Sequence, residues 1–162
     1  KAVVPLKPSI MTVHAAGGLA MMQAARDAAA ENADKLKVPR PRIIGVTVLT
    51  SMDDEALAGM GINITVNQLT KNLALLAKEA GLDGVVAGGS EIEMIRKLCG
   101  NDFVIVTPGV RLDDKRDDQK RTITPKDAIL KGATYNVRGR AVRDSDNPRA
   151  LFDKIYKDIK NK

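Results

Sequence analysis

The chain has 162 residues, of which 44% are hydrophobic and 28% charged, so its length and composition are those of a globular domain and exclude disordered and fibrous classes. The formal charge of +6 raises the question of nucleic acid, yet only 2% of residues are aromatic and no zinc-finger spacing occurs. We therefore expect a single domain over residues 1–162, no nucleic-acid partner, and positive charge that suits a small phosphorylated ligand.

Neither a membrane span nor a signal peptide is expected. No apolar run reaches the ~20 residues of a transmembrane helix, and the first residues lack a long apolar core. These observations predict a cytoplasmic location and no membrane partner. The lone Cys99 has no disulfide partner and no zinc-ligand spacing, so we expect it to pack in the core, with no metal site.

Short β-rich runs alternate along the chain with helical patterns. The predicted strands are Ile10–Val13, Ile43–Leu49, Gly84–Val86, Phe103–Val106 and Tyr135–Val137. Their nearly continuous apolar character is typical of parallel strands that helices cover.

The helices between these strands carry start and stop signals. Apolar residues from Val66 to Ala80 recur at helical spacing. Ser90 and Glu93 have the spacing of a capping box, which predicts a helix to about Leu98. Further helices are expected from Thr124-Pro125 to Gly132 and from about Pro148 onwards, the latter with Leu151, Ile155 and Ile159 on its buried side.

Alternating strands and helices predict an α/β fold with right-handed crossovers, either an open doubly wound sheet or a (β/α)8 TIM-barrel type. A closed barrel needs eight strands and about 250 residues. With about five βα units, the chain is expected to be either an open five-stranded sheet or a barrel that lacks its first three units.

Candidate site residues follow the first two predicted strands, because ligands bind at the carboxyl ends of parallel strands. His14 precedes Gly17 and Gly18, and it is interpreted either as a hydrogen-bonded strand-end histidine or as a functional residue. Thr50 and Ser51 supply adjacent hydroxyls, which are equally suited to capping the next helix and to contacting a ligand.

The last two predicted strands end in groups suited to phosphate. Residues 107–121 form a long charged loop that is more typical of a lid than of a spacer. Gly139 can expose a backbone N–H, and Arg140 can bind phosphate oxygens in a forked geometry. Together the two strand ends predict a phosphate site, at the position where (β/α)8 enzymes often bind phosphate.

Six segments in this order and spacing resemble the signatures of bacterial orotidine 5'-monophosphate decarboxylases. They are Thr12-Val13-His14-Ala15-Ala16-Gly17-Gly18, Val46-Thr47-Val48-Leu49-Thr50-Ser51-Met52, Gly81-Leu82-Asp83-Gly84-Val85-Val86, Thr107-Pro108-Gly109-Val110-Arg111, Asp117-Asp118-Gln119-Lys120-Arg121 and Gly139-Arg140. The resemblance covers essentially the whole chain and aligns it with strands four to eight of the family's barrel.

The resemblance implies a lyase that converts orotidine 5'-monophosphate to UMP in pyrimidine biosynthesis, without cofactor or metal. Carried over by position, Thr50 or Ser51 contacts the pyrimidine and Gln119 bridges pyrimidine and phosphate. The Gly139 backbone and Arg140 hold the phosphate, and Arg111 is a further ligand contact. The family is generally a homodimer, which we expect of the complete protein.

The family's catalytic lysines and aspartates belong to strands that precede the aligned region, so no catalytic residue is assigned in this chain. The spacing of Asp113, Lys115 and Asp118 repeats that of the family's catalytic set, but in a loop after the aligned seventh strand, and we interpret it as coincidence. We therefore expect the chain alone to be inactive.

Two residues beside the predicted phosphate site depart from the family. Arg138 stands where the family has an apolar residue, and Ala141 where it has proline. An arginine in a barrel strand carries a buried charge unless it is paired. We therefore expect Arg138 to reach an acidic residue or solvent.

Two other functions stay open. The first is a non-catalytic phosphate- or nucleotide-binding half barrel that needs a partner chain, because unpaired strand edges favour association. The second is a related phosphosugar enzyme such as hexulose-phosphate synthase, although residues 117–121 favour the nucleotide enzyme.

Overall fold

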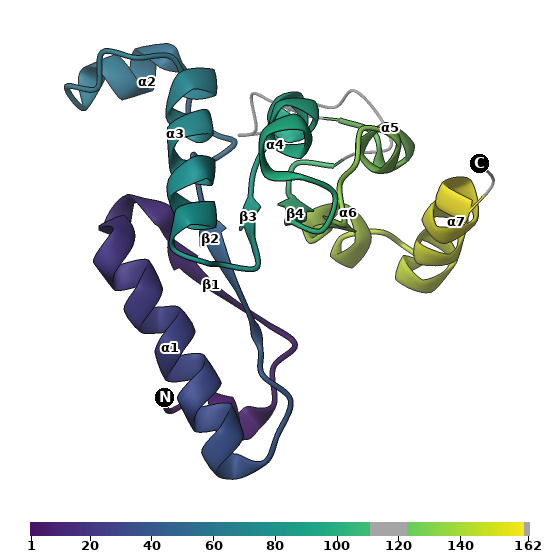
Figure 1. The fold of residues 1–162 in the computed structure, drawn as a ribbon. Coiled ribbons are helices and arrows are strands. Elements are labelled where there is room, and N and C mark those ends of the chain that lie inside the picture. Colours follow the sequence, from purple (N-terminus) through teal and green to yellow (C-terminus); the bar gives the residue numbers. More distant parts are fainter. Residues whose placement is uncertain (111–122, 161–162) are drawn as a thin grey trace.

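The computed structural model describes residues 1–110 and 123–160. Five parallel strands form one sheet, in the order β1-β2-β3-β4-β5 (Figure 1). They are β1 (Ile10–His14), β2 (Arg42–Val46), β3 (Gly84–Val86), β4 (Val104–Thr107) and β5 (Tyr135–Asn136). Because each strand lies beside the previous one with no reversal of order, the sheet has barrel topology and not doubly wound topology.

Helices connect the strands. The longer ones are α1 (Gly18–Leu36), α3 (Val66–Glu79), α4 (Ile92–Cys99) and α7 (Pro148–Lys160). The shorter ones are α2 (Asp54–Gly59), α5 (Pro125–Leu130) and α6 (Arg140–Arg143), with 3-10 turns at Val4–Leu6, Ala15–Gly17 and Gly89–Glu91. The amino end lies near α1 and the carboxyl end near α7, far apart in Figure 1. No described helix is both long and apolar enough to cross a membrane.

The main core lies between the sheet and its helices. Ile43, Val85 and Ile105 point from neighbouring strands into one cluster with buried residues of α1, α3, α4 and α5. Cys99 is among these residues, as the sequence predicts, and burial raises the pKa of its thiol. Residues of opposite parity, Ile44 among them, form a separate apolar cluster on the other face of the sheet.

That second face is concave. Arg42 begins β2 and Tyr135 begins β5, with two strands between them in the sheet. The Arg42 Nη1 nevertheless donates to the Tyr135 hydroxyl over 2.7 Å. Such a contact requires strong curvature, which is typical of a barrel wall.

Several predicted helix ends are confirmed, one is wrong, and the capping alternative for Thr50 and Ser51 is not supported. Thr124 Oγ1 accepts from the Asp127 N–H, and Pro125 begins α5. Ser90 and Glu93 form no capping box, because the 3-10 turn at Gly89–Glu91 precedes α4 and Ser90 bonds to the Glu91 carboxylate. Neither Thr50 nor Ser51 caps α2, since that cap is Asp53, which accepts from the Ala56 N–H.

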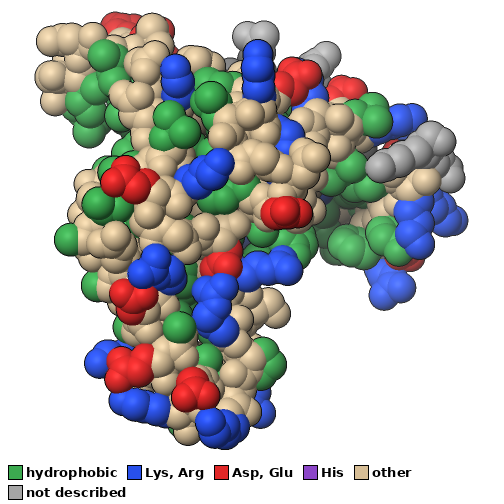
Figure 2. Space-filling model, in the orientation of Figure 1, with side chains coloured by type: hydrophobic (Ala, Val, Ile, Leu, Met, Phe, Trp, Pro, Cys, Tyr) green, Lys and Arg blue, Asp and Glu red, His purple; other side chains and the backbone are tan. Residues whose placement is uncertain are grey.

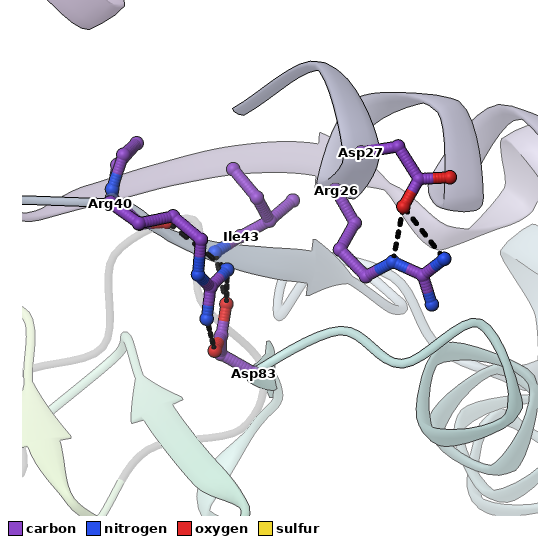
Figure 3. Close-up of polar contacts among 6 residues, drawn as sticks. Arg26, Asp27, Arg40, Ile43 and Asp83 are labelled. Carbon is purple, nitrogen blue, oxygen red and sulfur yellow. Dashed lines mark hydrogen bonds and ion pairs between the residues drawn. The ribbon is translucent and has the colours of Figure 1, made fainter. Parts of the chain in front are cut away.

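Asp83 joins three strands at the amino edge of the sheet (Figure 3). Its carboxylate accepts from Arg40 Nη1 over 2.9 Å and from the Ile43 N–H over 2.7 Å. Its own N–H donates to the Ile43 carbonyl, and its carbonyl accepts from the Val104 N–H. Burial alone would raise the pKa of Asp83, but the bonds from Arg40 and Ile43 and the charges of Arg40 and Arg42 outweigh it and lower the pKa.

An Asp83→Asn variant is therefore expected to lose about 1 kcal/mol of stability at neutral pH, because the 39% exposed Arg40 side chain is partly screened by solvent. A carboxylate with a lowered folded pKa stabilises the fold above its unfolded pKa of about 3.9, and this contribution is lost as pH falls through the folded value. Urea unfolding at neutral and acidic pH measures the difference, which should shrink in acid. Asp27→Asn, which removes an exposed pair with Arg26, is the control; an equal loss there would contradict the prediction.

Candidate functional site

Four of the six predicted ligand-binding residues follow strands at the carboxyl edge of the sheet. Thr50 and Ser51 follow β2, and Gly139 and Arg140 follow β5. Arg111 and Gln119 lie outside the described residues, as do Asp113, Lys115 and Asp118.

The β2 end is held by hydrogen bonds to β3. The Thr47 N–H and hydroxyl both donate to the Val86 carbonyl, over 3.2 and 2.7 Å. Beyond it, Thr50 is 7% exposed, whereas Ser51 is exposed. Of the two predicted pyrimidine contacts, the exposed Ser51 is therefore accessible to a ligand in this conformation, whereas Thr50 is buried.

His14 ends β1 on the concave side, since Val13 beside it packs into the helix-side core. Its side chain is exposed and forms no hydrogen bond with a described residue. The expectation of a hydrogen-bonded strand-end histidine is thus not supported. A functional role for His14 stays a prediction.

The ends of the charged loop meet at the carboxyl end of β4. Val110 pairs with Ile123, and the Ile123 N–H donates to the Gly109 carbonyl over 3.4 Å. Ile123 also packs against Gly89, where an added Cβ would lie 2.6 Å from its Cγ2. Val110 and Ile123, which flank the charged loop, therefore lie beside each other near the ends of β3 and β4, and residues 111–122 themselves lie outside the described residues.

The β5 end leads directly into α6. Val137 donates its N–H to the Thr107 carbonyl, which extends the β4–β5 ladder by one residue. Gly139 is the N-cap of α6, and its carbonyl accepts from the N–H groups of Val142 and Arg143. Arg140 is the first residue of this short helix and is exposed. Helix α6 was not predicted from the sequence, because four residues are too few to show a helical repeat of apolar side chains.

Arg138 lies beside these residues in an unusual environment. Its three guanidinium nitrogens are shielded from solvent and have no hydrogen-bond partner among the described residues. Burial lowers the pKa of Arg138. The expectation that Arg138 reaches an acidic residue or solvent is therefore wrong for the described part of the chain.

Within residues 1–110 and 123–160, no three His, Cys, Asp or Glu side chains gather in a way that could hold a metal ion. On the face shown in Figure 2, acidic and basic side chains are interspersed over α1, whereas Lys and Arg gather toward α7.

Comparison with known proteins identifies related sequences over nearly the whole chain. The sequence model of the "Orotidine 5'-phosphate decarboxylase / HUMPS family" matches residues 2–155. The orotidine 5'-phosphate decarboxylase of Moorella thermoacetica is 50% identical over 98% of the chain, and that of Rhodospirillum rubrum is 47% identical over 91%. The chain spans 64% and 60% of the lengths of these two relatives.

Solved structures also match nearly the whole chain. The orotidine 5'-phosphate decarboxylase of Lactobacillus acidophilus superposes with a TM-score of 0.77 at 30% identity, covering 94% of this chain and 63% of that one. An uncharacterized conserved protein of Geobacillus kaustophilus superposes with a TM-score of 0.73 at 33% identity, covering 93% and 63%. The incomplete barrel predicted from the sequence is thus confirmed.

Proposed function

Because the chain belongs to the orotidine 5'-phosphate decarboxylase / HUMPS family, we propose that it binds orotidine 5'-monophosphate and its product UMP through the carboxyl edge of the sheet. The observation that carries this proposal is the placement of Gly139 and Arg140 at the turn from β5 into α6. In this arrangement the Arg140 guanidinium and the backbone of the turn bind the phosphate. Ser51, with Thr50 behind it, contacts the pyrimidine, and Gln119 and Arg111 complete the ligand contacts.

The reaction proposed for the whole protein is the cofactor-free decarboxylation of orotidine 5'-monophosphate. The phosphate takes no part in bond breaking, so the energy of holding it serves to orient the ring and to stabilise the transition state. The lid role that the sequence predicts for the charged loop falls on residues 111–122, which lie outside the described residues. This chain supplies binding groups, and we propose that the 162 residues alone do not catalyse the reaction.

The single domain, the homodimer and the cytoplasmic location expected from the sequence stay proposals. An association of some kind is supported by the two edge strands, β1 and β5, each of which has one unpaired side within the described sheet. Phe152 and Tyr156 on α7 are also 56% and 50% exposed, which favours a further surface against them.

An Arg140→Ala variant is expected to bind UMP at least about tenfold more weakly than the unchanged chain, because a charge-assisted bond to phosphate is worth roughly 1.5–3 kcal/mol. Calorimetric titration with UMP measures this loss. Arg143→Ala is the matched control, since it removes a neighbouring arginine that pairs with Asp144. Equal affinities for Arg140→Ala and the unchanged chain would refute the phosphate site.

The same preparation tests the catalytic part of the proposal. Incubation with orotidine 5'-monophosphate is expected to give no UMP above the uncatalysed rate. Measurable turnover that Arg140→Ala abolishes would show that the chain holds a catalytic group that the sequence comparison did not find. UMP binding without turnover is also the result expected of a non-catalytic half barrel, so adding the remaining barrel segment and regaining turnover separates the two functions.

A further inference from the structure

Arg138 carries a buried guanidinium that has no role in the proposed binding of the ligand. All three guanidinium nitrogens are inaccessible to solvent and unpaired within the described residues. A buried charge without a partner costs several kcal/mol, so an arginine is expected to persist there only if something compensates it.

Two polar side chains on this part of the sheet, Thr107 and Asn136, form no hydrogen bond with it. Thr107 and Asn136 are register partners on β4 and β5, and Asn136 faces the helices, since its Nδ2 donates to the Pro125 carbonyl over 3.1 Å. Arg138 follows Asn136 by two residues, the spacing that places side chains on the same side of an extended chain. Yet Thr107 Oγ1 and Asn136 Oδ1 are themselves buried without hydrogen-bond partners in the described structure.

Arg138 is close to the proposed phosphate position. It precedes Gly139 directly and Arg140 by two residues, which limits the distance between the Cα atoms of Arg138 and Arg140 to about 7 Å. A buried charge near that turn interacts with an anion more strongly than an exposed one, because protein and not salt solution fills the space around it.

We propose that Arg138 is a positioning residue for the phosphate: a cation that no described residue compensates in the ligand-free fold, whose charge the phosphate dianion of the ligand balances across the Gly139–Arg140 turn. This inference rests on the proposed function. It adds a second arginine, whose positive charge attracts the phosphate without touching it. The arrangement trades stability of the empty protein for affinity toward phosphorylated ligands. Sequence comparison alone would class Arg138 only as a departure from an apolar position.

The proposal predicts that an Arg138→Met variant gains thermal stability without ligand and loses affinity for UMP. The ligand-free variant should melt at a higher temperature, because methionine fills similar volume without a buried charge. Its affinity for UMP should fall roughly tenfold, whereas its affinity for uridine, which has no phosphate, should not change. An Arg138→Lys variant keeps the charge and should retain UMP affinity within about threefold of the unchanged chain.

Melting curves and titrations with UMP and uridine on the full chain test this role of Arg138. Unchanged UMP affinity in Arg138→Met, with normal binding by the unchanged chain, overturns the role of Arg138 and leaves the Arg140 site intact. A lower melting temperature, or failure to fold, shows that the guanidinium already has a partner and also overturns it. If the unchanged chain does not bind UMP, the proposed function and this inference both fail.

Discussion

Replacing Gly84 with alanine is expected to destabilise the protein by about 3 kcal/mol or more, at the upper end of what overpacking usually costs. Gly84 begins β3 in the middle of the sheet, between Ile44 of β2 and Val104 of β4. An added Cβ would lie 2.0 Å from the Val104 carbonyl oxygen and 2.6 Å from its Cβ. Because the obstacle is backbone of a neighbouring strand, no rotamer change relieves it, and β3 and β4 must move apart.

Gly59→Ala is the matched control for this substitution. Gly59 is the last residue of α2, and nothing lies within 4 Å of a Cβ built there. Alanine in a helix is favoured over glycine by up to about 1 kcal/mol, so this variant should be as stable as the unchanged chain or slightly more stable. Chemical unfolding of both variants measures the contrast. Equal stabilities for Gly84→Ala and Gly59→Ala would show that the β3–β4 contact is looser than the structure indicates.

The sequence predicted strongly patterned elements well. The apolar spacing from Val66 to Ala80 predicted α3 within one residue at its carboxyl end, because an amphipathic helix on a sheet must repeat its apolar side every turn. The run Ile43–Leu49 predicted a longer strand than β2, which ends at Val46. Val48 lies beyond the strand and packs with Leu57 and Val66 in a separate cluster. Apolar character alone does not distinguish a buried strand residue from a buried residue in the loop that follows.

The candidate site was predictable in position and only partly in detail. Parallel topology alone places Ser51 and Arg140 at one edge of the sheet, because side chains after parallel strands share that edge. That a charge at position 138 of the predicted strand is costly unless it is paired was foreseeable from the sequence. Its lack of a described partner was not, since this depends on which side chains the tertiary fold brings near it. The same reason accounts for the failed capping box at Ser90.

Arg96 is expected to be the most important single side chain for holding the C-terminal half of the sheet to its helices. Its Nη1 donates to the carbonyls of Gly100, Asn101 and Phe103 over 2.7–2.8 Å. Its Nη2 donates to the carbonyl of Gly132 over 2.6 Å. One guanidinium thus bonds to the end of α4, the residues before β4 and the turn after α5, and Gly132 lies 36 residues after Arg96 in the sequence.

An Arg96→Met variant keeps much of the aliphatic stem and removes every one of these donors. The carbonyls of Phe103 and Gly132 are partly buried, so losing a charged donor should cost about 3 kcal/mol in the free energy of unfolding. Arg149→Met is the control, because Arg149 is 85% exposed and pairs only with Asp153 on its own helix among the described contacts. Urea unfolding gives both values. If the two variants lose the same stability, water replaces the guanidinium at the four carbonyls and the connection between α4, β4 and α5 does not depend on Arg96.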